Sequence, residues 1–212
     1  MAADEIKSCY NISEEKIRTI PNGVDTLQFN TDARNRNRTH ARSIFDLSEK
    51  DNVIGFSSTN FELKGLGSLI ETLSTLPDSY KLLIAGNRNP EKYKKLAKKL
   101  HVEKRISFLG YVKDMPQFYS ALDLLCHPSA YDTFGSVVAE ALAMGLPVIT
   151  TKNVGAASLI TEMVNGHTIE MQDIEKKLKH AIPAMIQKQH NTGNNILSQN
   201  DCFKSYLQLI EN

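Results

Sequence analysis

Short apolar runs alternate along most of this chain with longer segments in which apolar residues recur at helical spacing. The strand-like runs are residues 52–57, 81–85, 105–109, 122–126, 147–150 and 167–169. Parallel strands need long crossover connections, and such crossovers are right-handed. The pattern therefore predicts an α/β fold, a doubly wound parallel Rossmann-like sheet whose ligands bind at the carboxyl ends of the strands.

The two ends of the chain depart from this alternation. Residues 1–10 are predicted to form a helix that stands before the first strand. After the last strand, residues 171–189 have helical periodicity, 190–200 form a polar Asn- and Gln-rich break, and 201–211 are predicted to be a last short helix.

Composition adds limits on size and partners. With 212 residues, 41% of them hydrophobic, the chain can bury the core of one large domain. Its net charge of +1 gives no basic excess, so we expect no nucleic acid partner. Cys9, Cys126 and Cys202 lack the spacing of a disulfide framework or a metal site, and no signal peptide or membrane span is evident. These features suit a cytoplasmic protein.

The segment 129–151 carries the strongest chemical signal. Between residues 133 and 150 its only charged side chain is Glu140, in a run of small residues that we expect to form a helix from near Gly135 to Gly145. A lone carboxylate in a close-packed segment is costly to bury without hydrogen-bond donors. Either a polyhydroxyl ligand or a structural partner should therefore contact Glu140.

Asp132 lies eight residues before Glu140 and just ahead of this helix. Its carboxylate, the first-turn N–H groups and Glu140 are expected to converge on one cleft at the helix N-terminus. The alternative is that Asp132 is an N-cap and Glu140 a solvated acid that complements the helix dipole.

Together with its flanks at 128–129 and 145–149, this spacing resembles the Glu-x7-Glu motif of family 4 retaining glycosyltransferases, which have the GT-B architecture. Asp132 stands at the first acidic position and is one methylene shorter than the family's glutamate. The resemblance implies that Glu140 holds the ribose hydroxyls of a nucleotide sugar. Asp132 and the amides that follow it would hold the transferred sugar and the phosphate. The residues of that turn are Thr133, Phe134, Gly135 and Ser136.

Further loops would complete the donor site. Lys64, at the start of a predicted helix, matches a family lysine that neutralises the diphosphate, but Thr59 stands where many relatives have arginine. Arg88 is a candidate to replace that charge. Gly86 would permit close approach of the donor, and backbone groups beside Val112 would pair with the base.

Residues 21–25, Pro-Asn-Gly-Val-Asp, followed by Phe29, resemble the junction between the two domains of these enzymes. The chain is accordingly identified as the carboxy-terminal half of a GT-B glycosyltransferase. Residues 1–25 are then the end of a missing amino-terminal acceptor domain and the linker. Residues 26–189 are the nucleotide-sugar-binding domain, and 190–212 are the polar break and the C-terminal helix.

The resemblance implies transfer of a hexose from a UDP-sugar, UDP-glucose or similar, with retention at the anomeric carbon. Lys64 and Asp132 would act in catalysis, without a metal or another cofactor. The acceptor would be a glycan or a lipid-linked molecule in the biosynthesis of lipopolysaccharide, polysaccharide or another glycoconjugate. Two alternatives stay open: a GT-B-fold sugar-nucleotide epimerase, and a non-catalytic nucleotide-binding regulatory module.

Two remaining features have ordinary interpretations. Cys126 and His127 are neighbours at a strand end, so they should point to opposite faces and are interpreted as packing residues, not as a nucleophile and its base. The basic stretch 91–99 is typical of the solvent face of an amphipathic helix, with peripheral contact to the inner face of an anionic membrane as the alternative.

Overall fold

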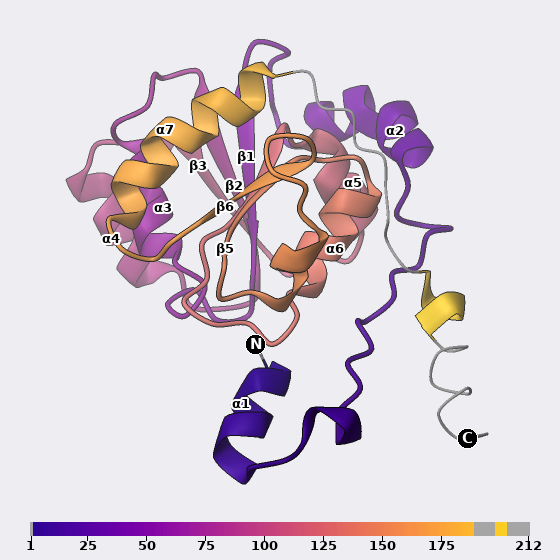
Figure 1. The fold of residues 1–212 in the computed structure, drawn as a ribbon. Helices are drawn as coiled ribbons and strands as arrows, with labels where there is room; N and C mark the ends of the chain where they lie inside the picture. Colours follow the sequence, from indigo (N-terminus) through magenta and orange to yellow (C-terminus); the bar gives the residue numbers. More distant parts are fainter. Residues whose placement is uncertain (1, 189–197, 203–212) are drawn as a thin grey trace.

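The protein is described by a computed structural model, which covers residues 2–188 and 198–202. Its centre is a sheet of six parallel strands in the order β3-β2-β1-β4-β5-β6 (Figure 1). The strands are β1 Asn52–Ser57, β2 Tyr80–Ala85, β3 Ile106–Gly110, β4 Leu124–His127, β5 Val148–Thr151 and β6 Gly166–Ile169. All six predicted strands are present, each within two residues of its expected start.

Helices cover both faces of the sheet (Figure 1). The α-helices within the described residues are α1 Ala2–Tyr10, α2 Thr31–Ile44, α3 Leu66–Leu73, α4 Glu91–Lys99, α5 Met115–Ala121, α6 Ser136–Ala143 and α7 Ile174–Gln187. Short 3₁₀ turns are η1 Glu14–Lys16, η2 Glu103–Arg105 and η3 Gly155–Leu159. Helix α1 lies apart from both layers, and the expected helix at 201–211 falls mostly outside the described residues.

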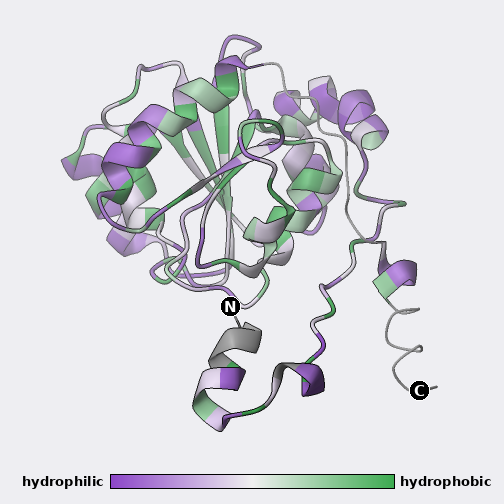
Figure 2. Cartoon of the chain, viewed as in Figure 1, coloured by the Kyte–Doolittle hydropathy of each residue, from purple (hydrophilic) through white to green (hydrophobic). Residues whose placement is uncertain are grey.

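Alternation along the strands divides the core into two layers. Ile54, Leu82 and Ile149 pack toward α3, α4 and α7, whereas Val53 and Leu83 pack toward α2, α5 and α6. Successive side chains of a strand point to opposite faces, and both faces of this sheet are covered. The inner strands β1, β2 and β4 are consequently apolar over most of their length, and Figure 2 shows the centre of the sheet hydrophobic between helices whose outer surfaces are largely hydrophilic.

The strand order determines where a ligand can bind. From β1 the chain proceeds outward to β2 and β3 on one side, then returns to β4 on the other side of β1. The crossover loops leave the sheet in opposite directions at this point and open a crevice at the carboxyl ends of β1 and β4. The loops that carry Lys64 and Asp132 follow these two strands.

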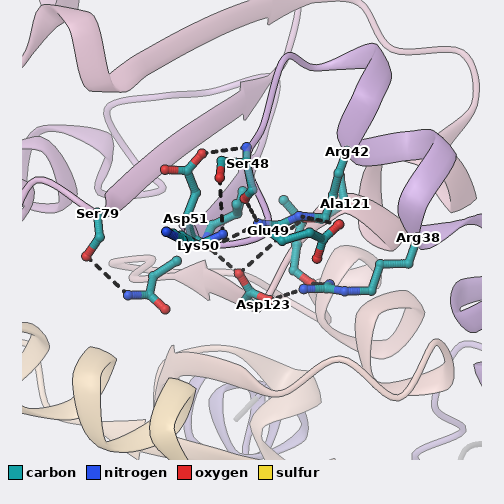
Figure 3. A network of polar contacts seen from close by, with 12 residues as sticks. Arg38, Arg42, Ser48, Glu49, Lys50, Asp51, Ser79, Ala121 and Asp123 are labelled. Carbon is teal, nitrogen blue, oxygen red and sulfur yellow. Dashed lines mark hydrogen bonds and ion pairs between the residues drawn. The ribbon is translucent and has the colours of Figure 1, made fainter.

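At the opposite, amino-terminal end of β4, a charged network fastens α2 to the sheet (Figure 3). Arg38 Nη2 lies 2.6 Å from Asp123 Oδ1, and Arg42 Nη1 lies 3.3 Å from Asp123 Oδ2. The backbone N–H of Val53, in β1, donates to the same Oδ2 at 2.7 Å. Arg42 is only 1% exposed and also donates to the carbonyls of Ala121, Ser48 and Asp51. Through its two terminal nitrogens the buried guanidinium therefore joins α2, the strand ends and the turn before β1, whereas its Nε has no hydrogen-bond partner among the described residues.

Residues from the two ends of the chain meet beside α6. Val24 pairs with Ser198 as parallel strands do, and the N–H of Gln199 donates to the Val24 carbonyl at 3.0 Å. The Cys202 thiol contacts the Pro21 carbonyl at 3.2 Å. The junction-like segment 21–25 is thus held against the residues that follow the polar break. The division of the chain into domains at residues 25 and 189 stays a prediction.

Candidate active site

A cavity of about 440 Å³ lies at the carboxyl ends of β1, β2 and β4. The predicted site residues in its wall are Thr59, Lys64, Gly86, Val112, Asp132 and Ser136. They come from four different loops, which the doubly wound topology brings to one edge of the sheet. The structure thus brings these six predicted residues together at one cavity, and their role in binding a donor stays a prediction.

Gly86 allows the loops after β1 and β2 to come together. Its φ is +152°, and a Cβ at this position would lie 2.0 Å from the Ser58 carbonyl oxygen. Any other residue would have to push the two loops apart, because that separation is far below van der Waals contact. Glycine therefore shapes this wall of the cavity.

Three charged or polar side chains meet in the cavity wall. Lys64 Nζ donates to Asp132 Oδ2 at 2.7 Å and to the Tyr131 carbonyl at 2.8 Å. His127 Nε2 lies 3.1 Å from the same Oδ2. The other carboxylate oxygen, Oδ1, accepts from the Phe134 N–H at 3.3 Å. One oxygen of Asp132 is thus held by two side chains, while the other has a long backbone contact.

Burial and hydrogen bonding set the protonation of this cluster. The hydrogen bond from His127, followed by the contact with Lys64, lowers the pKa of Asp132 well below its usual range, although partial burial opposes the shift. Burial lowers the pKa of His127, whose ring is 2% exposed, and outweighs the attraction of Asp132. At neutral pH the cluster is a carboxylate, an ammonium and a neutral imidazole.

The backbone on both sides of Asp132 is anchored to the loop after β5. The N–H of Asp132 donates to Asn153 at 3.0 Å, and the Asp132 carbonyl accepts from Gly155 at 3.0 Å. Gly135 follows as the N-cap of α6 in a left-handed conformation with φ +86°, which a glycine adopts without strain. Asp132 is therefore not the N-cap, and that alternative is excluded. Ser136 opens α6 at the edge of the cavity.

Glu140 does not lie in the cavity that contains Asp132, although the sequence predicted one cleft for both acids. It borders a second cavity of about 380 Å³, together with Phe134, Ser136 and the junction residues 22–25. Ser136 lines both cavities, which are therefore neighbours. Glu140 Oε2 accepts a hydrogen bond from the Tyr119 hydroxyl at 2.8 Å, and burial raises the pKa of Glu140 despite this bond. Glu140 is thus a half-buried, partnered acid and not a solvated one.

Other predicted residues lie away from the main cavity. Arg88 is exposed and is not among the residues that line it, and Thr133 is likewise exposed on the turn before α6. The charge that Thr59 lacks is therefore not supplied by Arg88 in this conformation. Gly135 is buried and forms the N-cap at the start of α6.

His127 corrects one sequence interpretation. We interpreted it as a packing residue, and that interpretation is wrong, because its ring lines the cavity and contacts Asp132. The sequence feature that could have identified His127 as a site residue is its position at the carboxyl end of β4. Cys126, by contrast, packs in the layer of α3 and α7, where burial raises the pKa of its thiol.

Other residues of the loop after β3 also line the cavity. Tyr111 is 76% exposed at its rim, and Lys113 and Met115 are in the same wall. Of this loop, only Val112 is a site residue predicted from the sequence. An exposed aromatic ring beside a cavity offers a flat apolar surface to a planar ligand.

Residues 2–188 and 198–202 contain no group of His, Cys, Asp or Glu side chains arranged to hold a metal ion. In the same residues no helix is sufficiently long and apolar to cross a membrane. The lysines of α4 are mostly exposed, as either a solvent face or a membrane-contacting face would require.

Comparison with known proteins places this geometry in context. The sequence model of the family described as Glycosyl transferases group 1 matches residues 37–199. The lipopolysaccharide glucosyltransferase WaaG of Escherichia coli strain K12 is 28% identical over 177 residues, covering 82% of this chain and 47% of the relative.

Solved structures give the same result for the fold. The crystal structure of WaaG superimposes with a TM-score of 0.80 at 26% identity and covers 87% of this chain and 51% of that one. The C-terminal domain of LpcC, a glycosyl transferase group 1 family protein from Francisella tularensis, has a TM-score of 0.65 at 25% identity. That match covers 87% of this chain and 98% of the LpcC domain. The chain spans about half the length of the curated relatives it matches.

Proposed function

We propose, given that this chain belongs to the family of glycosyl transferases group 1, that it binds a UDP-hexose and forms the donor half of a retaining glycosyltransferase. The supporting observation is the juxtaposition of Lys64, Asp132 and the first residue of α6 in one cavity at the reversal point of the sheet. A diphosphate, a sugar and a nucleoside are the ligand parts that these groups suit.

Each part of the donor has a proposed contact. The N-terminal turn of α6 and the ammonium of Lys64 face the diphosphate, because both favour negative charge. Asp132 accepts hydrogen bonds from sugar hydroxyls. The base lies against the loop at Tyr111 and Val112, and Glu140 holds the ribose diol after its side chain turns from Tyr119 toward the main cavity.

In the proposed reaction the bond between the anomeric carbon and the diphosphate oxygen breaks, and its electron pair stays on the diphosphate. The acceptor oxygen bonds to the same face of the anomeric carbon, and its proton passes to the leaving phosphate. Lys64 and the α6 N-terminus stabilise the charge that develops on the diphosphate, which is the kind of electrostatic assistance that dominates many enzymes. Asp132 binds the sugar and forms no covalent intermediate.

The acceptor side of the cleft is proposed to come from an amino-terminal domain of the GT-B type. Transfer requires donor and acceptor to be held at reacting distance, so this chain alone should bind donor and hydrolyse it slowly at most. The likeness to a lipopolysaccharide glucosyltransferase makes a glycan or lipid-linked acceptor the first to test. Adding an acceptor domain, in cis or in trans, should produce UDP release that depends on the acceptor.

The test of the proposed function is a nucleotide panel. UDP, GDP, ADP and NAD are added to the 212-residue chain, and thermal unfolding and ligand-detected NMR report binding. A ligand at about 100 times its Kd should raise the free energy of unfolding by about 2.7 kcal/mol. UDP should give the largest shift. Preference for NAD, or no shift with any nucleotide, would contradict the proposal.

A further inference from the structure

The two oxygens of the Asp132 carboxylate have unequal surroundings. Oδ2 receives Lys64 Nζ at 2.7 Å and lies 3.1 Å from His127 Nε2. Oδ1 accepts only from the Phe134 N–H at 3.3 Å among the described residues. A carboxylate can accept about four hydrogen bonds. The remaining capacity is therefore concentrated on Oδ1.

The proton on His127 is determined by its partners. An ionised carboxylate is only an acceptor, so Nε2 must carry the hydrogen that points to Asp132. Nδ1 is buried and has no hydrogen-bond partner in the described part of the chain. A charged imidazolium would place a second N–H there without an acceptor, which burial penalises. His127 accordingly acts as a neutral donor with a single N–H, which it directs to Asp132.

The structure also holds His127 in a fixed position. It is the last residue of β4, its carbonyl accepts from the Thr150 hydroxyl at 2.8 Å, and it pairs in register with Thr150 of β5. A buried side chain on a central strand has few alternative rotamers. Lys64, by comparison, lies on a loop, and its ammonium has a third N–H beyond those that contact Asp132 and Tyr131.

We propose that His127 is a positioning residue for sugar recognition, fixing the carboxylate of Asp132 so that Oδ1 stays available to a hydroxyl of the donor's sugar. This inference rests on the proposed function. Lys64 is shared between Asp132 and the diphosphate, whereas His127 contacts the carboxylate alone. Loss of the N–H that His127 donates should therefore weaken binding of the sugar part of the donor and leave the affinity for the nucleoside diphosphate unchanged.

Two amide variants separate the hydrogen from the rest of the ring. In His127→Gln the amide nitrogen can occupy the place of Nε2, whereas in His127→Asn it reaches only the place of Nδ1. Calorimetry gives the Kd of UDP and of the UDP-hexose that the wild-type chain binds best among glucose, galactose and N-acetylglucosamine. The measured quantity is the ratio of the UDP-hexose Kd to the UDP Kd.

The ratio should stay within about twofold of wild type in the Gln variant and rise about tenfold in the Asn variant, the loss expected for one hydrogen bond to a charged group. UDP affinity should change by less than about twofold in both, because the diphosphate contacts remain. If the Asn variant does not fold, as judged by thermal unfolding, His127→Phe replaces it, with a ring of similar size and no donor.

Equal ratios in the Gln and donor-lacking variants would overturn the inference. Parallel loss of UDP and UDP-hexose would also overturn it, since His127 would then be a structural residue. A wild-type chain that binds neither ligand would instead reject the proposed function. A wild-type chain that binds both, with variants that behave identically to it, would reject only the role of His127.

Discussion

Two aspartates flank β4, Asp123 immediately before it and Asp132 five residues after its end, and the chain surrounds them in different ways. At Asp123 both carboxylate oxygens contact guanidinium groups, and a backbone N–H adds a third donor. At Asp132 two side chains contact one oxygen, and a cavity lies beside the group.

The difference separates a structural acid from a binding acid. Arg38 and Arg42 present planar forks that join the carboxylate to backbone carbonyls, so protein groups hold both oxygens of Asp123. Lys64 is a point charge on a flexible stem that can be shared with a ligand. Each carboxylate accepts three hydrogen bonds among the described residues, but arginines hold both oxygens of Asp123, whereas Oδ1 of Asp132 has only the 3.3 Å contact with a backbone N–H. An acid fixed at both oxygens by arginines stabilises the fold, and one with a weakly bound oxygen beside a cavity is available for recognition.

Removal of Asp123 should therefore cause the largest effect on stability. In Asp123→Ala the buried guanidinium of Arg42 loses its carboxylate, and breaking a buried ion pair costs about 3 to 5 kcal/mol of unfolding free energy. Urea denaturation measures this loss. Chain that remains folded at low denaturant should bind UDP with wild-type affinity.

Asp132→Ala is the matched variant at the other end of β4. Its loss of unfolding free energy should be smaller, about 1 to 2 kcal/mol, since it leaves one buried neutral N–H, that of His127, without an acceptor and no fully buried charge. Its UDP-hexose affinity should fall. Similar stability losses in the two variants would remove the distinction between a structural and a binding acid.

The second effect concerns Glu140. If this side chain holds the ribose diol by two charge-assisted hydrogen bonds, Glu140→Gln should weaken UDP binding by about 1.5 to 3 kcal/mol. Calorimetry with UDP measures the change, and Glu71→Gln, in an exposed position of α3, is the control. Unchanged affinity in a folded variant would mean that Glu140 serves only Tyr119 and the second cavity.

The fold could be predicted because it depends on local patterns. Runs such as 52–57 and 147–150 are apolar at nearly every position, and helix-forming segments of crossover length separate them. These facts imply parallel strands buried on both faces of a doubly wound sheet, whereas the strand order with its reversal beside β1 comes from the structure. The sequence did not indicate the arginine network, because the partners of Arg42 lie at distances of 6 to 81 residues along the chain.

The site could be predicted only as far as the loops that contribute to it. Strand ends place Lys64, Gly86, Val112 and Asp132 together, but the direction of a side chain depends on packing. Glu140 turns toward Tyr119, which no spacing indicates. The interpretation of His127 was wrong because a strand residue next to a buried cysteine is ordinarily a packing residue. Only the fold of the 128–132 loop brings the carboxylate of Asp132 back to the His127 ring.

The third effect is the phosphate contact of Lys64. Lys64→Met should weaken UDP by about 1 to 2 kcal/mol and leave uridine nearly unchanged, because uridine lacks the diphosphate. Competition NMR measures both ligands, with the exposed Lys92→Met as control. Equal losses for UDP and uridine would assign Lys64 a structural role through Asp132 instead.

The smallest effect is the pH dependence that distinguishes Glu140 from Asp132. Burial raises the pKa of Glu140 above its ordinary 4.5, whereas His127 and Lys64 hold the pKa of Asp132 below its ordinary 3.8. Ribose hydroxyls need the ionised form of Glu140. UDP-hexose affinity should therefore begin to fall while the pH is still above 4.5, by less than about tenfold per pH unit. UDP-hexose is the suitable ligand because its phosphates do not titrate in this range.

Stability should respond to the same protonation in the opposite direction. A raised folded-state pKa means that Glu140 stabilises the fold fully below pH 4.5, and that this contribution is lost as the pH rises through the folded value. The contribution of Asp132 has the reverse sign, present above pH 3.8 and lost as the pH falls further. Between pH 4.5 and neutrality, binding should strengthen while the Glu140 part of stability declines. The Glu140 part of both slopes is the difference between wild type and Glu140→Gln, measured by calorimetry and urea denaturation across pH. His127, whose lowered pKa adds stability as the pH rises, contributes to both proteins and cancels in that difference. A binding slope that is unchanged in Glu140→Gln would show that another group titrates, and Glu140 would lose its place in the donor site.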